Sequence, residues 1–153
     1  MRVALRDMTY VPAMTPGQIN RVEQMEEALK SVPEANVETQ HMFHAGVYVR
    51  TVNMKRFTMF TGALMRIPTV LIISGDVSMY IGDGVVRKTG YHVLMGETGR
   101  KQAFFCHEDT SITMVFASNA KTVEEAEEQF TDEWCKLVSR RMANEVIKSE
   151  VQP

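Results

Sequence analysis

The chain has 153 residues, of which 44% are hydrophobic and 24% charged, as in an ordinary globular domain. This composition excludes a disordered, collagen-like or low-complexity chain. The formal net charge is −2, so no cationic excess is available to drive binding to nucleic-acid phosphates. We expect no nucleic-acid partner and interpret the basic pairs as solvated charges in turns. These pairs are Lys55-Arg56, Arg87-Lys88 and Arg100-Lys101.

A helix is predicted near the N-terminus. Thr15 and Gln18 form a capping box, and Pro16 occupies the first helical position. Apolar residues then recur at helical spacing until Pro33, which ends the helix. Residues 1–45 are therefore expected to hold one amphipathic helix and a polar linker. The apolar positions are Ile19, Val22, Met25 and Leu29.

Short strands are predicted from residue 46 to residue 118. Apolar and β-branched residues alternate there in short runs, separated by glycine-containing turns. Two such turns are predicted at 74–76 and at 82–84, and the second is typical of a tight hairpin. About eight short strands without a helical period predict a mainly β fold, a single antiparallel barrel or sandwich. The clearest runs are Val47–Val52, Phe57–Thr61, Thr69–Ile73 and Val77–Ile81.

A long amphipathic helix is predicted over residues 119–153. Thr122 and Glu125 form a second capping box, and acidic residues crowd the first turns, where the helix dipole favours them. One apolar stripe follows, which we expect to pack on the barrel or, alternatively, on another subunit. The whole chain is expected to make one compact domain. The stripe consists of Val123, Ala126, Phe130, Trp134, Leu137 and Val138.

Four segments between Gly46 and Ala117 carry a resemblance to a known family. They are Gly62-Ala-Leu-Met65, Val70-Leu-Ile-Ile-Ser-Gly-Asp76, Gly99-Arg-Lys101 and His107-Glu-Asp-Thr110. Together they resemble the cupin superfamily, and in particular small single-domain cupin-like proteins of bacteria and phages. The resemblance implies a jelly-roll β-barrel flanked by helices, and a homodimer or higher homo-oligomer.

The resemblance also implies where a cupin metal would bind. The ligand places of the first motif fall near Gly62, Leu64 and Pro68, and the histidine place of the second falls on Gln102. The 31 residues from 45 to 75 contain no His, Asp, Glu or Cys. A transition-metal site needs about 3–4 such ligands, so we expect the usual metal centre to be lost and no cofactor to be present.

Four histidines remain as candidates for chemistry. His41 and His44 are expected in an exposed loop, although one of them could enter the barrel. His107, followed by Glu108 and Asp109, is either a general base or part of a solvated turn. If a displaced metal site exists, its ligands would be His41, His107 and Glu108. His92 is expected to be a structural, hydrogen-bonded residue.

The two cysteines are expected as reduced thiols. The sequence shows no signal peptide and no apolar run of the ~20 residues that span a bilayer. We therefore expect a cytoplasmic protein without a membrane partner, in the host cytoplasm if a phage encodes it. Cys106 and His107 are neighbours in a strand and should face opposite ways, which argues against a Cys–His nucleophile.

The barrel interior is the remaining candidate site. Methionines, aromatics and a few Arg or Gln groups would suit a small, partly apolar or anionic molecule. We expect a non-catalytic module that binds a small molecule or a protein partner without a metal. The alternatives are a phage-encoded structural or assembly protein that acts through its oligomer surface, and a metal-dependent oxygenase or isomerase. The expected ligand-binding residues are Tyr48, Arg50, Met65, Arg66, Gln102 and Phe104.

Overall fold

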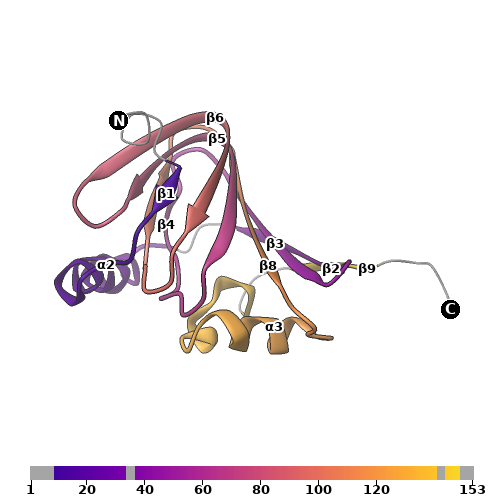
Figure 1. Ribbon diagram of the computed structural model, residues 1–153. Helices are drawn as coiled ribbons and strands as arrows, with labels where there is room; N and C mark the ends of the chain where they lie inside the picture. Colours follow the sequence, from indigo (N-terminus) through magenta and orange to yellow (C-terminus); the bar gives the residue numbers. More distant parts are fainter. Residues whose placement is uncertain (1–8, 34–36, 141–143, 149–153) are drawn as a thin grey trace, which may run out of the picture.

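The computed structural model describes residues 9–33, 37–140 and 144–148, and strands dominate these parts of the chain (Figure 1). None of the described helices is long and apolar enough to cross a membrane. In chain order the elements are β1 (Tyr10–Val11), α2 (Pro16–Leu29), β2 (Glu38–His44), β3 (Val47–Met54), β4 (Met59–Thr61), β5 (Thr69–Tyr80), β6 (Val85–Gly96), β7 (Ala103–Cys106), β8 (Thr110–Ala117), α3 (Val123–Phe130), the 3-10 turns η1 (Trp134–Lys136) and η2 (Val138–Arg140), and β9 (Asn144–Lys148).

The strands form one curved sheet in the order β1-β6-β5-β8-β3-β2-β9, and β7 connects β5 to β4. Most neighbours are antiparallel, but β1 runs parallel to β6 and β9 parallel to β2. The mainly β fold predicted from the sequence is confirmed. Strands β1, β2 and β9 lie outside the range 46–118 and nevertheless belong to the same sheet.

Strands β5 and β6 form the corner of the barrel. The first half of β5 pairs with β8, and its second half, from Val77, pairs with β7. The corner falls where Gly75 pairs with Gly90, and both residues have a positive φ. The turn predicted at 74–76 is therefore a bend within one continuous strand, because glycine lets the strand change direction without losing its partners. The hairpin predicted at 82–84 is confirmed.

The side chains of the strands alternate between the barrel interior and solvent. In β3 and β8 every second residue is buried, as the period of a half-buried strand requires. Helix α2 begins with the predicted capping box at Thr15 and buries Val22 against Ala103 of β7. Figure 1 shows α2 and α3 on different sides of the strands.

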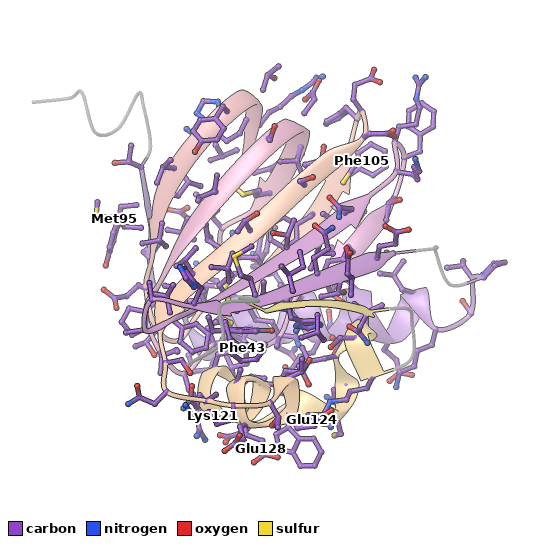
Figure 2. All side chains as sticks on the ribbon, turned by 90° about the vertical axis from the view of Figure 1, so that its right-hand side faces the viewer. Phe43, Met95, Phe105, Lys121, Glu124 and Glu128 are labelled. Atoms are coloured by element: carbon purple, nitrogen blue, oxygen red, sulfur yellow. The ribbon has the colours of Figure 1, made fainter. Side chains whose placement is uncertain are left out.

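The C-terminal helix is much shorter than predicted. α3 ends at Phe130, and the hydroxyl of Thr131 donates to the Leu64 carbonyl (2.7 Å) and accepts the Glu133 amide (3.0 Å). These bonds turn the chain away from the helical path, and residues that would have continued the helix form η1, η2 and β9 instead. Leu137 and Val138 are still buried, as the apolar stripe predicted. Figure 2 shows Lys121, Glu124 and Glu128 on the outward side of α3.

Candidate ligand-binding cavity

The barrel encloses a cavity of about 870 Å³. Its inner wall is mostly apolar and comes from inward-facing residues of β5, β7 and β8 together with Met65 of the preceding loop. The volume lies within the ~300–1,000 Å³ range of small-molecule sites. The inner apolar residues are Met65, Leu71, Phe104, Ile112 and Met114.

The mouth of the cavity lies between the end of α2, β4 and η1. Lys30, Phe57 and Lys136 line this side and are exposed, which places them at the rim. Cys135 also lines the cavity and is exposed, whereas Cys106 is fully buried in the core. The two thiols therefore differ sharply in their access to solvent.

A buried lysine holds one side of the mouth together. Lys101 is fully buried, and its Nζ donates to Glu133 (2.7 Å) and to Glu26 of α2 (3.2 Å). Burial alone would raise the pKa of Glu133, but the hydrogen bonds from Lys101 and from the Leu64 amide outweigh it and lower that pKa. The expectation that Arg100 and Lys101 are solvated turn charges is wrong, because both side chains are buried. It is also wrong for Arg87 and Lys88, which lie within β6, where Lys88 is buried.

A second polar cluster joins α3 and η2 to the sheet. The Arg50 guanidinium donates to Glu127 (2.9 Å), to Ser139 (3.0 Å) and to the Tyr48 hydroxyl (3.3 Å). Glu127 also accepts from Ser139 and from Arg140 (2.6 Å). Both members of the Arg50–Glu127 pair are buried, so each depends on the other for charge compensation.

His41 belongs to the same region and not to an exposed loop. It lies in β2, fully buried, with Nδ1 2.6 Å from the Tyr48 hydroxyl and Nε2 2.7 Å from Oδ1 of Asn144 in β9. Burial lowers the pKa of His41, so the neutral ring is favoured in the folded protein. His44 is exposed at the end of the same strand. The sequence predicts a polar linker and an exposed loop here, whereas the segment is a strand that pairs with β3, which follows directly, and with the distant β9.

Arg100 is a buried charged group of the cavity wall that sequence reasoning did not select. It is 2% exposed, and its guanidinium donates to the Thr69 hydroxyl (2.8 Å), the Glu97 carbonyl (2.5 Å) and Oε1 of Gln102 (3.3 Å). Burial lowers the pKa of Arg100 to about 10. Its position in a Gly-Arg-Lys segment gave no signal, because such segments are usually solvated turns.

Four of the six expected ligand-binding residues line the cavity, namely Arg50, Met65, Gln102 and Phe104. Tyr48 is buried and bonded to His41 and Arg50, outside the lining residues. Arg66 is half exposed and faces away, where it pairs with Asp132 and donates to the Gln129 carbonyl. Its side chain points out because its own amide caps the end of α3 through the Phe130 carbonyl.

The displaced metal ligands are not brought together. The ring of His107 bonds to Ser78 (2.8 Å), Glu108 pairs with Arg56 on the surface, and His41 is held in the β2–β9 cluster. Among residues 9–33, 37–140 and 144–148, no three His, Cys, Asp or Glu side chains are grouped as a metal site. The metal-binding side-chain types in the cavity lining are Glu26, Glu133 and Cys135, and both carboxylates are bonded to Lys101, so this set does not fit the histidine-rich centre of cupin enzymes.

The two remaining candidates for chemistry, His92 and Cys106, make structural contacts. His92 lies 2.8 Å from the Thr89 carbonyl through Nε2, as a hydrogen-bonded structural residue would. Burial raises the pKa of the Cys106 thiol, which makes it a weak nucleophile at neutral pH. Its sulfur lies 3.9 Å from that of Met54 in the core.

No protein-family model matches the chain, and no curated protein matches it in sequence. Solved structures do resemble it. A cupin superfamily protein from Desulfitobacterium hafniense is 13% identical, with a TM-score of 0.48 over 60% of this chain and 86% of that one. A cupin 2 conserved barrel domain protein from Leptotrichia buccalis is 11% identical (TM-score 0.47; 59% and 44%). The cupin domain of Cnp3 from Schizosaccharomyces pombe is 14% identical (TM-score 0.45; 68% and 80%).

These similarities concern the fold alone.

Proposed function

We propose that this protein is a non-catalytic cupin-like module that binds a small molecule in its barrel. The observation that carries the proposal is the cavity of about 870 Å³, which has an apolar inner wall and a few inward polar groups. No three of the described histidines, cysteines and carboxylates are grouped so that they could hold a metal ion, which supports binding over metal-dependent chemistry.

Binding can be tested with N-phenyl-1-naphthylamine, a neutral apolar dye that fluoresces in apolar surroundings. We expect saturable binding and slower alkylation of Cys135, which lies in the cavity wall. Cys106 provides an internal control, because it is buried and should stay unmodified throughout. Failure of the dye to bind saturably, or binding that leaves the alkylation of Cys135 unchanged, would contradict the proposal.

A matched pair of variants locates the binding site. Ala63 is a small residue of the cavity wall, and Ala63→Trp should weaken dye binding by at least about tenfold, since ~50 Å² of lost apolar contact corresponds to ~1.3 kcal/mol. Ala117→Trp, at the exposed end of β8, should bind the dye like the unmodified protein. Equal weakening in both variants would place the dye outside the cavity.

A second candidate function is self-assembly through the outer face of the sheet. One apolar residue from each of seven strands forms a continuous row across this face. The pairing register of the strands places these residues directly opposite one another on neighbouring strands. The row is Tyr10, Met95, Val70, Val115, Val49, Met42 and Ile147. Figure 2 shows Met95 projecting away from the strands.

A second copy of this chain is the partner that fits the row. Seven strands ~4.8 Å apart give a row about 29 Å long. A standard interface buries ~800 Å² on each partner and has an apolar centre within a polar rim, and a row of this length can form such a centre. Apolar sheet faces of this kind pack face to face about 10 Å apart.

Substitution of Val70, which is 41% exposed in the middle of the row, tests this assembly. The protein should form a concentration-dependent dimer in light scattering, and Val70→Lys should make it monomeric at the same concentrations, because an interfacial charge would be buried. Val85→Lys changes a residue that is 67% exposed at the far end of β6 and should stay dimeric. A monomeric wild-type protein at every attainable concentration would exclude this function.

A further inference from the structure

We infer that the cavity ligand is a small monocarboxylate with an apolar body, and that Arg100 binds its carboxylate. This inference rests on the proposed small-molecule function and adds the chemical class of the ligand. It follows from the charges of the cavity wall, from the free donors of Arg100 and from the distribution of apolar side chains.

The charge balance of the wall singles out Arg100. The described cavity-lining cations are Lys30, Arg50, Arg100 and Lys136. Three of them pair with carboxylates: Lys30 with Glu27, Arg50 with Glu127, and Lys136 with Glu133. Within the described residues, Arg100 has hydrogen bonds to neutral oxygens and no ion pair. The charge of Glu97 acts on Arg100 without forming an ion pair with it, so an anionic ligand would supply the direct counter-charge that this buried cation lacks.

Arg100 also keeps donors for such a ligand. A guanidinium has five N–H donors, and the hydrogen bonds of Arg100 to described residues use three of them, one on each nitrogen. One N–H of each terminal nitrogen remains, and a carboxylate is the group that two such donors recognise best.

The backbone at Gly96 holds the guanidinium in place. A Cβ atom on Gly96 would lie 2.5 Å from Cζ of Arg100, so the glycine leaves the space in which the guanidinium rests. The bonds to the Thr69 hydroxyl and the Glu97 carbonyl fix its orientation from two sides. The cation is therefore positioned before any ligand arrives, which lowers the entropic cost of binding.

The rest of the inner wall favours an apolar ligand body. Leu71, Phe104 and Met114 are buried and lie with Arg100 in the lining of the same cavity. Gln102 offers the one inward side-chain amide among the described lining residues, and its carbonyl oxygen already accepts from Arg100. One cationic anchor beside an extended apolar wall fits an aliphatic or aromatic acid better than a sugar or a nucleotide.

The experiment compares two acids with their uncharged amides. Octanoate and octanamide, and phenylacetate and phenylacetamide, are titrated into the full-length protein, and displacement of N-phenyl-1-naphthylamine is measured. Each acid should bind at least about tenfold more tightly than its amide, because a charge-assisted pair of hydrogen bonds replaces a neutral one. If the dye binds while acid and amide displace it equally, the carboxylate inference is wrong and the proposed cavity function stands.

Variants assign the preference to Arg100. Arg100→Met should bind acid and amide alike, Arg100→Lys should keep part of the preference, and the control Lys121→Met, at an exposed residue outside the cavity lining, should keep all of it. Circular dichroism checks that each variant is folded; the comparison on the unmodified protein decides the ligand class if Arg100→Met does not fold. A preference that survives in folded Arg100→Met would overturn the role of Arg100. Absence of dye binding in the unmodified protein would overturn the cavity function itself.

Discussion

Replacement of Glu127 by Gln is expected to lower the free energy of unfolding by roughly 3–5 kcal/mol, the cost of breaking a buried ion pair. Glu127 is fully buried and receives hydrogen bonds from Arg50, Ser139 and Arg140. Its loss leaves the Arg50 guanidinium buried without a counter-charge. Urea unfolding, followed by circular dichroism, measures the change.

Two further variants separate the ion pair from the helix. Glu124→Gln removes an exposed charge from the outward side of α3 and should change stability by less than about 0.5 kcal/mol (Figure 2). The double variant Arg50→Met with Glu127→Leu should regain much of the lost stability, because apolar residues of similar volume can replace a buried pair. Equal losses in Glu127→Gln and Glu124→Gln would contradict this interpretation.

The effect of Glu127 should depend on pH. Burial alone raises the pKa of Glu127, but the hydrogen bonds from Ser139, Arg50 and Arg140 and the charge of Arg50 outweigh it, so the folded pKa lies below its ordinary value of 4.5. The stabilisation is therefore complete above pH 4.5 and is lost as the pH falls through the folded pKa. The difference in stability between wild type and Glu127→Gln should shrink over the same pH range.

Replacement of Gly75 by Ala is expected to be the most damaging glycine substitution in the barrel. A Cβ at this position would lie 2.5 Å from the Thr110 hydroxyl and 2.7 Å from the Asp109 carbonyl, and the φ of +145° is unfavourable for any residue with a side chain. Steric overlap and backbone strain together should cost roughly 2–5 kcal/mol, measured by thermal and urea unfolding.

Other glycines provide graded controls. Gly90 has a φ of +92°, and no atom lies near the position of a new Cβ. Gly90→Ala should therefore show the cost of backbone strain alone, a loss of about 1–2 kcal/mol in the free energy of unfolding. Gly84 lies in the adjoining hairpin without a positive φ or a close neighbour, and Gly84→Ala should be nearly neutral. A smaller loss in Gly75→Ala than in Gly90→Ala would show that Thr110 can move aside.

Local signals predicted several elements correctly. The capping boxes at Thr15 and Thr122 start helices where expected, because a cap needs only residues within one turn. The hairpin at 82–84 and the strand that begins at Val47 follow from short-range turn chemistry and alternation. These features depend on a few neighbouring residues, so the sequence contains them directly.

The errors occurred where distant residues decide the outcome. The apolar spacing after Phe130 is helical, yet Thr131 bonds to Leu64, 67 residues away, and the helix ends there. The mostly polar sequence of 38–44 predicts a linker, whereas the segment forms β2, which pairs with the adjacent β3 and with β9 about 100 residues away. Local propensity is a weak preference, and tertiary hydrogen bonds override it.

At the candidate site, too, some residues could be predicted from the sequence and others could not. Alternation within the strands made Arg50 and Phe104 candidates for the barrel interior, and both line the cavity, as do Met65 and Gln102 from the loops before β5 and β7. Only the tertiary structure decided that Arg66 turns outward and that Arg100 is buried without an ion pair among the described residues. Strand period is a local property of the sequence, whereas burial and charge compensation depend on residues that meet only when the sheet closes.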